Sequence, residues 1–295
     1  MQPLASWLVA RPQNAVLALA LTLVLPVLQI LSGIIMVLLV LKQGVRLAAI
    51  EGAAAAALLL LIAMVTGLAP AQTLVAVLTT WLPAIALAGT LQATRSLTLT
   101  LQISVLVAAV VALGYYVVVD DLVAHWEPVI TALLVWTRDS DLHEQASLMA
   151  SNPALTADML TLAVVWSSWM LYMVYLLLGY RFFERVTGKS DLFGRFRDLN
   201  FGRVIALIMA LVSLAGFASG AASLQSVAFI LFAVFWLQGL SIVHWMHSVG
   251  QLPLFVVVMT YVLMPILHVF LILALAVLGY TDAWFDYRRR AAKQQ

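Results

Sequence analysis

The side chains best suited to chemistry lie in the last third of the chain, within long apolar stretches. His244 and His247 are three residues apart and share one face of a helix, and His268 follows in the next stretch. An imidazole can relay a proton, contact a substrate or bind a metal, and Gln238 and Tyr261 add an amide and a phenol nearby. These five residues are the candidates for a ligand-binding site. For the histidines, the pattern itself favours an interfacial or packing role over contact with a substrate or relay of a proton.

Metal binding and catalysis have little support in the residue pattern. A zinc site takes three or four ligands, and with no cysteine in the chain and no acidic residue in 204–281, only His268 is left to complete the pair His244–His247. Gly-x-Ser-x-Gly, Walker-type and His-Glu-x-x-His motifs are absent from the sequence. Glu51 is expected to complement the dipole at the start of a helix. We therefore expect no enzyme activity, no catalytic residue, no metal and no cofactor.

The environment of these residues follows from the shortage of charge. Only 9% of the 295 residues are charged, against about 25% in soluble domains, while 64% are hydrophobic and the mean hydropathy is +1.07. Five windows have no Asp, Glu, Lys or Arg: 12–41, 52–94, 96–119, 159–180 and 204–281. A water-soluble enzyme is excluded. The net charge of +2, and the lack of a basic run interleaved with DNA-binding signals, give no reason to expect a nucleic-acid partner. The expected partner is the lipid bilayer.

The apolar windows predict an all-α, polytopic transmembrane helix bundle that forms a single membrane domain over residues 1–295. About eight hydrophobic segments are expected, most of them close to the ~20 residues that cross a bilayer. They cover residues 15–41, 52–69, 72–92, 97–119, 159–180, 204–222, 225–247 and 253–279.

The first and last segments have 27 residues each and carry Pro26 and Pro265 near their centres. Each is either one kinked span or a hairpin of two short helices. If both turn back at their prolines, every Lys and Arg except Arg138 falls on one face of the membrane, and the positive-inside rule makes that face cytoplasmic. We therefore predict two proline-broken hairpins in a bacterial inner-membrane protein with both termini in the cytoplasm.

Two polar segments connect the spans. The acidic segment 120–158 is predicted to be an outer loop with a short interfacial helix at Val129–Trp136. The basic, aromatic segment 181–203 is predicted to be a cytoplasmic loop in which Gly188 ends one helix and Ser190 starts another. Phe193, Phe196 and Leu199 would then share one face of that second helix.

Two groups of residues are candidates for docking. Ala49, Ala53 and Ala57 form a small-residue stripe of the kind that lets helices approach closely, within the chain or toward another membrane subunit. In the basic loop, the residues predicted to contact lipid headgroups or a cytosolic partner are Phe193, Arg195, Phe196 and Arg197.

The C-terminal segment has the character of a structural anchor at the membrane interface. Asp282 and Asp286 are four residues apart, and Trp284 and Phe285 lie between them. We expect Asp286 to pair with Arg289 or Arg290.

Several stretches together resemble the YybS-like family of bacterial polytopic membrane proteins, a domain of unknown function. They are the Lys42-Gln43-Gly44-Val45-Arg46 turn before an alanine-rich helix, Phe235-Trp236-Leu237-Gln238-Gly239-Leu240-Ser241, the aromatic and basic loop from Tyr180 to Arg197, and Leu278-Gly279-Tyr280-Thr281-Asp282-Ala283-Trp284-Phe285-Asp286-Tyr287-Arg288. The resemblance covers nearly the whole chain, with its most specific motif at the C-terminus.

That family is distantly similar to the S subunits of energy-coupling-factor vitamin transporters. The resemblance implies a helical membrane protein that captures a small molecule and docks on an energising module, here through the stripe Ala49, Ala53 and Ala57. Because no nucleotide-binding motif is present, an external ATPase module would supply the energy. The expected function is binding, or helping to transport, a small uncharged or amphiphilic molecule. The alternative is a structural or regulatory scaffold of a membrane protein complex.

Overall fold

The computed structural model describes residues 7–8, 11–25 and 28–292, so Pro26 lies outside the described residues. Helices and loops account for all of the described chain, as the all-α prediction requires. Contacts divide the chain into two compact units, Met1–Thr100 with Ser168–Arg195 and Leu101–Ser167 with Phe196–Gln295. The three boundaries fall inside helix α6 (Leu97–Val118), inside helix α9 (Pro153–Thr187) and in the chain between Arg195 and Phe196. Each unit is described below by itself.

Seven of the described helices are long and apolar enough to cross a membrane, which confirms a polytopic architecture. They are α4 (Val45–Thr66), α5 (Pro70–Thr94), α6, α9, α10 (Gly202–Ser219), α11 (Ala222–Ser248) and α13 (His268–Phe285). Shorter apolar helices are α2 (Pro12–Val24), α3 (Gln29–Gln43), α7 (Leu122–Thr137) and α12 (Leu254–Leu263). Two further helices are α8 (His143–Ser151) and α14 (Tyr287–Ala292).

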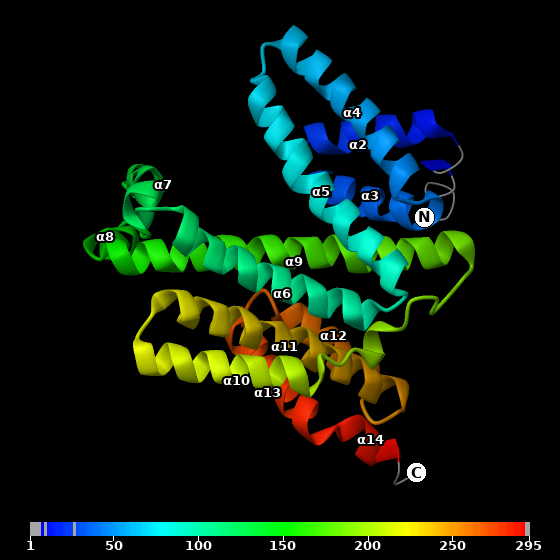
Figure 1. The fold of residues 1–295 in the computed structure, drawn as a ribbon, viewed down its shortest axis with the longest axis vertical. Coiled ribbons are helices and arrows are strands. Elements are labelled where there is room, and N and C mark those ends of the chain that lie inside the picture. The colour runs from blue at the N-terminus through cyan, green and yellow to red at the C-terminus, as the bar shows by residue number, and fades with distance from the viewer. Residues whose placement is uncertain (1–6, 9–10, 26–27, 293–295) are drawn as a thin grey trace. The chain divides into compact units, whose positions relative to one another are not determined.

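Local sequence signals set most of the helix ends. Pro12 and Pro70 occupy the first positions of α2 and α5, where the missing N–H has no cost. Gly67 ends α4 in the left-handed conformation, at a φ of 77°. The turn that follows joins α4 and α5 into the hairpin seen in Figure 1. The punctuation at Ser151-Asn152-Pro153 also separates α8 from α9.

The first long apolar segment is broken in the first unit, as predicted. The hydroxyl of Ser32 in α3 donates to the carbonyl of Leu19 in α2 at 3.2 Å. In one continuous helix these two residues would be about 20 Å apart, so α3 turns back on α2. The indole of Trp81 in α5 donates to the same Ser32 hydroxyl at 2.9 Å, which ties α5 to the hairpin.

The C-terminal part of α9 packs directly on α3 in the same unit. A Cβ on Gly33 would lie 2.4 Å from the ring of Tyr175, and one on Gly179 would lie 2.5 Å from the side chain of Val37. These glycines allow the two helices to approach closely. At about 52 Å for its 35 residues, α9 is longer than the predicted span 159–180 and continues through Arg181–Thr187 of the predicted basic loop, up to the predicted helix end at Gly188.

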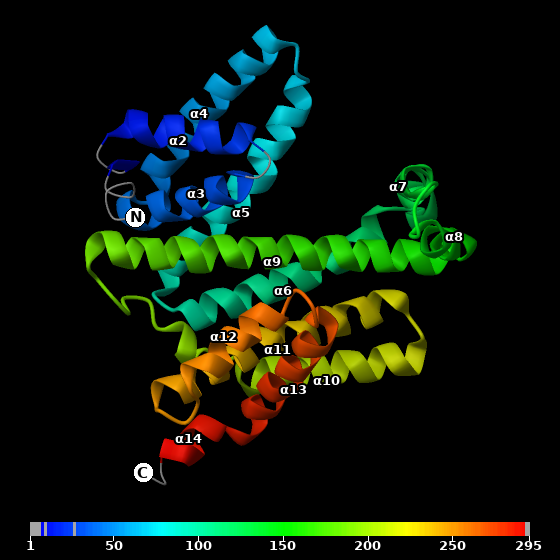
Figure 2. The same ribbon diagram turned by 180° about the vertical axis from the view of Figure 1, so that it is seen from behind.

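In the second unit, the last long segment also breaks at its proline. Residues 264–267, which include Pro265, separate α12 from α13. Figures 1 and 2 both show the chain reversing direction between these helices. The hairpin predicted for 253–279 is therefore confirmed as a backbone feature.

The most intimate helix contact of the second unit joins α11 to α13. A Cβ on Gly239 would lie 2.0 Å from the carbonyl oxygen of Leu275, and one on Gly279 would lie 2.0 Å from that of Phe235. Backbone therefore meets backbone at this crossing, and only glycine fits at either position. Helix α11 is buried on almost all sides, whereas each of the other candidate spans has fewer than half of its residues buried.

Three local predictions need correction or adjustment. No helix begins at Ser190: the chain from 188 to 201 is irregular apart from one 3₁₀ turn, Phe196–Asp198, because Asp191 and Gly194 have φ values of 61° and 94°. Glu51 lies in the second turn of α4 and is buried against Gln43, so it is not at the helix start. The interfacial helix predicted at Val129–Trp136 begins earlier, at Leu122, where Asp121 caps it. The predicted C-cap Gly188 does end α9.

Candidate functional site

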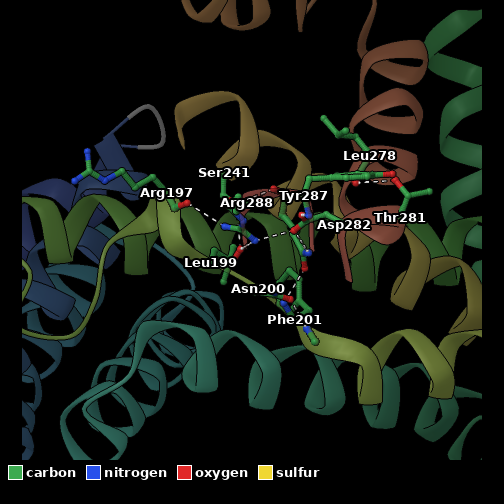
Figure 3. Close-up of polar contacts among 12 residues, drawn as sticks. Arg197, Leu199, Asn200, Phe201, Ser241, Leu278, Thr281, Asp282, Tyr287 and Arg288 are labelled. Atoms are coloured by element: carbon green, nitrogen blue, oxygen red, sulfur yellow. Dashed lines mark hydrogen bonds and ion pairs between the residues drawn. The ribbon is translucent and has the colours of Figure 1, made fainter. Parts of the chain in front are cut away.

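The strongest polar cluster of the second unit surrounds the carboxylate of Asp282, which is fully buried near the end of α13. Its Oδ2 accepts hydrogen bonds from Arg288 Nη2 at 2.8 Å and from Gln238 Nε2 at 2.9 Å. Its Oδ1 accepts from the backbone N–H of Tyr287 at 3.0 Å. Figure 3 shows how Asp282 and Arg288 face each other across this cluster.

The same cluster holds the irregular chain between α9 and α10. The guanidinium of Arg288 donates to the carbonyls of Arg197 at 3.0 Å and Leu199 at 2.8 Å (Figure 3). Gln238 Oε1 accepts from the N–H of Phe201 at 2.7 Å, and the Ser241 hydroxyl donates to the Leu199 carbonyl at 3.1 Å. The cluster therefore joins α11, the C-terminal segment and residues 197–201. We call it the Asp282 network.

This arrangement bears on the prediction that Gln238 binds a ligand. Both ends of its side-chain amide are engaged by protein groups, and the side chain has no exposed surface. A ligand would have to displace Asp282 or the Phe201 N–H to reach it. The geometry thus makes Gln238 a part of the structural network.

An ion pair that the sequence did not point to, Asp282 with Arg288, holds the C-terminal segment. It forms because α13 ends at Phe285 and Asp286 adopts a left-handed φ of 49°, which turns Arg288 back toward Asp282. The pairing expected between Asp286 and Arg289 or Arg290 stays a prediction.

A second, smaller polar group lies around His244. Its Nε2 is 2.8 Å from the hydroxyl of Tyr261, which joins α11 to α12, and Phe196 meets the imidazole edge-on at 5.7 Å between ring centres. His244 is half-buried and Tyr261 is 47% exposed. In either histidine tautomer, the Tyr261 oxygen keeps a lone pair free to accept a hydrogen bond. This pair can therefore still contact a ligand.

The other two histidines do not join that pair through the contacts that are described. His247 Nδ1 donates to the carbonyl of Leu252 at 3.0 Å, which closes the turn after α11. His268 is exposed at the first position of α13. Among the residues that the structure describes, no group of three or more His, Asp or Glu could hold a metal ion. The idea that His268 completes a metal site with His244 and His247 is therefore not supported.

Three other glutamines of the apolar helices bind main-chain or side-chain groups of neighbouring segments. Gln92 donates to the Val40 carbonyl at 2.8 Å, and Gln102 donates to that of Phe201 at the same distance. Gln29 donates to the Thr80 hydroxyl at 3.1 Å. These amides satisfy polar groups that lipid cannot.

The predicted docking residues have different environments. Ala53 and Ala57 are exposed and Ala49 is half-exposed, while Ala48, Gly52 and Ala55 form the buried side of α4. Phe193 is buried in the first unit against Tyr180 and Phe183, and its N–H donates to the Tyr180 hydroxyl at 3.0 Å. Arg195 is 45% exposed, 3.9 Å from Asp191. Arg197 and Phe196 in the second unit are half-buried.

The importance of Asp282 was missed by sequence reasoning, although a signal was present. Asp282 is the residue that ends the charge-free window 204–281, so it is the acidic group nearest to the apolar core at that end of the chain. A carboxylate in that position is costly unless it is paired. Its partner Arg288 follows only six residues later, beyond the helix end.

Comparison with known proteins places the chain in one family and gives no functional relative. Residues 14–283 match the family described as "Predicted membrane protein (DUF2232)". No curated protein and no solved structure matches the chain.

Proposed function

The chain belongs to the DUF2232 family of predicted membrane proteins, and we propose that it binds a small uncharged or amphiphilic molecule at the His244–Tyr261 pair. The observation that carries this proposal is a hydrogen-bonded polar pair, 2.8 Å apart and partly exposed, within a stretch that has no charged side chain. Ionisable and polar groups inside a membrane are costly and commonly mark function.

The chemistry of the pair favours a neutral ligand group. His244 and Tyr261 offer hydrogen-bond donors and acceptors, and Phe196 adds an aromatic edge beside the imidazole. Residues 204–281 provide neither a cation for an acid nor an anion for an amine. A hydroxyl, carbonyl or ether group of an amphiphile fits these partners.

We further propose that the protein acts as an S-type subunit in the bacterial inner membrane, with an external ATPase module as energy source. The resemblance to the YybS-like family, and through it to S subunits, supports this role. The exposed faces of Ala53 and Ala57 on α4 support docking to another membrane subunit, because small side chains allow close helix contact. The same observation favours the second candidate, a scaffold of a membrane protein complex.

The distribution of basic residues supports a cytoplasmic location for both termini. In the first unit, the Arg95 guanidinium lies 5.8 Å above the Phe193 ring, and the Leu97 N–H donates to the Phe193 carbonyl at 2.7 Å. The turn after α5 and residues 188–195 therefore lie at the same end of the helices of this unit. In the second unit, Arg288 donates to the Arg197 carbonyl, so these two arginines lie at the same end of the helices. Because the chain has no cysteine, single cysteines at Lys42 and Lys293 can be labelled selectively from either side. Labelling of either from the periplasm would contradict this topology.

Native mass spectrometry combined with lipidomics tests the binding proposal. We expect the wild-type protein to retain a small molecule in stoichiometric amount. Tyr261→Phe and His244→Ala should retain less of it or none. Tyr116→Phe is the matched control, because its hydroxyl also makes a side-chain hydrogen bond in the second unit, to Ser226 at 3.0 Å. A stoichiometric protein partner without a small molecule would favour the scaffold. Equal retention in all variants would contradict binding at this pair.

A further inference from the structure

Three of the buried tryptophans, Trp81, Trp126 and Trp236, differ in what their indole N–H groups contact. Trp81 donates to Ser32 and Trp126 donates to Thr161, each at 2.9 Å. Trp236 in α11 is only 6% exposed, and its Nε1 has no hydrogen-bond partner among the residues that the structure describes. Among the buried side-chain nitrogen and oxygen atoms of the described residues, this is the one without a hydrogen-bond partner.

An indole N–H is a donor only, so the missing partner must be an acceptor. Buried indole N–H groups usually find one, and an orphan in an otherwise satisfied structure calls for an explanation. The neighbours one turn away on α11 cannot help, because Phe232, Ala233, Gly239 and Leu240 have no polar side-chain atoms. The backbone carbonyls of a helix interior are occupied by the helix itself.

The position of Trp236 relates it to the polar pair proposed above. It precedes His244 by eight residues on the same helix, which is about 12 Å of helix rise. His247 follows Trp236 by eleven residues, or about three full turns, so the two side chains leave α11 in nearly the same direction. The eight residues to His244 make about 2.2 turns, so its side chain leaves α11 about 80° further round, and Trp236 and the two histidines lie within one half of the helix circumference.

We propose that the Trp236 indole N–H donates to an uncharged acceptor oxygen of the molecule that His244 and Tyr261 bind. This inference rests on the proposed function and narrows it: the ligand is an elongated amphiphile with a polar end and a second neutral oxygen about 12 Å further along its length. The oxygen is a carbonyl, ether or hydroxyl oxygen. It belongs either to a bilayer lipid, as an ester carbonyl, or to a smaller co-purifying molecule.

The test is the ¹H–¹⁵N signal of the indole group in full-length protein labelled with ¹⁵N-tryptophan. Trp236→Phe, Trp81→Phe and Trp126→Phe assign the three signals, and each substitution keeps an aromatic ring. Spectra are recorded for the protein as purified from its membrane, after exchange into nanodiscs of dialkyl-ether phosphatidylcholine, which has no ester carbonyl, and after return to nanodiscs of the diester lipid. A fourth spectrum follows addition of the organic extract of the purified protein to the ether-lipid nanodiscs.

We expect the Trp236 signal to be at its hydrogen-bonded, downfield position as purified and to move upfield in ether lipid. If the signal moves back downfield with diester lipid alone, the acceptor oxygen belongs to a bilayer lipid. If it moves back only when the extract is added, the oxygen belongs to a smaller molecule. The Trp81 and Trp126 signals should not move, because Ser32 and Thr161 are internal acceptors. A Trp236 signal that stays at one position in all four samples would overturn the inference.

The two proposals can fail separately. If the Trp236 signal responds as expected in both the wild type and Tyr261→Phe, the tryptophan site holds and the His244–Tyr261 site fails. If Tyr261→Phe abolishes retention of the small molecule while the Trp236 signal never moves, the proposed function holds and this inference fails.

Discussion

Two ion pairs, one in each unit, show how differently the same chemistry can be used. In the first unit Arg181 and Glu184 are three residues apart on α9 and 2.9 Å from each other, with the arginine 64% exposed and the glutamate 8%. In the second unit Arg288 and Asp282 are 2.8 Å apart, but the arginine is 11% exposed and the aspartate not at all. The first pair stays within one helix, whereas the second reaches two other segments of the chain.

The two pairs should therefore contribute differently to the free energy of unfolding. In the first pair the arginine stays in contact with solvent when its partner is lost, and a pair with such a partner contributes about 0–1 kcal/mol because water and salt screen it. A buried pair is held by its full set of hydrogen bonds, and removal of one partner leaves an uncompensated charge that costs about 3–5 kcal/mol. We therefore expect the second unit to depend on its ion pair and the first unit to tolerate the loss of its own.

The largest effect is expected for Asp282→Ala. The Arg288 guanidinium would lose its counter-charge, and Gln238 and the Tyr287 N–H would lose an acceptor. The free energy of unfolding should fall by about 3–5 kcal/mol, as measured by denaturant titration in detergent micelles. Arg288→Ala should be comparably severe. A loss below 1 kcal/mol for both would remove the distinction between the two pairs.

The next effect concerns the glycines at the closest helix contacts. Gly279→Ala places a methyl group against the Phe235 carbonyl, and overpacking of this kind costs about 1–3 kcal/mol or more. Gly33→Ala should cost less, because the added methyl group meets a side chain, the buried Tyr175 ring, which must shift but is not backbone. Gly114→Ala is the control, since a Cβ there meets nothing within 4 Å. Thermal unfolding of the three variants gives the order; equal midpoints for Gly279→Ala and Gly114→Ala would contradict it.

A smaller effect is expected from Trp81→Phe in the first unit. The substitution keeps the buried ring and removes the hydrogen bond to Ser32, which still donates to the Leu19 carbonyl. The expected loss is about 0.5–1.5 kcal/mol in the same denaturant titration. Trp236→Phe should cost nothing in delipidated protein, because its N–H has no partner to lose among the described residues. An equal loss in both variants would argue that Trp236 has an internal acceptor.

The smallest effect should come from Glu184→Gln. The pairing with Arg181 weakens, but the glutamine oxygen can still accept from the Asp191 N–H that Glu184 binds at 2.8 Å. A change of about 0.2–1 kcal/mol, smaller in high salt, is expected. Should this variant prove as unstable as Asp282→Ala, the comparison between the two pairs would fail.

Much of the helical framework is predictable, because hydrocarbon leaves few alternatives to a helix. Charge-free windows located the spans, and Pro265 marked a real reversal of the chain. The segment 188–201 could not be predicted in the same way. Its helical spacing of Phe193, Phe196 and Leu199 is overridden by tertiary hydrogen bonds, in which Tyr180 binds the Phe193 N–H and the Gly194 carbonyl.

The site was only partly predictable, for a related reason. Residue type and spacing identified Gln238, His244 and Tyr261 as polar groups in the membrane, but not which of them the chain itself occupies. That depends on the turn at Asp286, which returns Arg288 to Asp282 and so fixes the amide of Gln238. The His244–Tyr261 contact depends on the angle between α11 and α12, which no local pattern encodes.

The most direct test of the binding proposal is a double-mutant cycle at the polar pair. The molecule extracted from purified protein is titrated back into wild type, His244→Ala, Tyr261→Phe and the double variant in nanodiscs, and Kd is measured by isothermal titration calorimetry. Because the two side chains act as one hydrogen-bonded unit, we predict that each single variant loses about 10-fold or more in affinity, roughly 1.4 kcal/mol, and that the double variant loses little more. Unchanged Kd values in all four proteins would contradict the account.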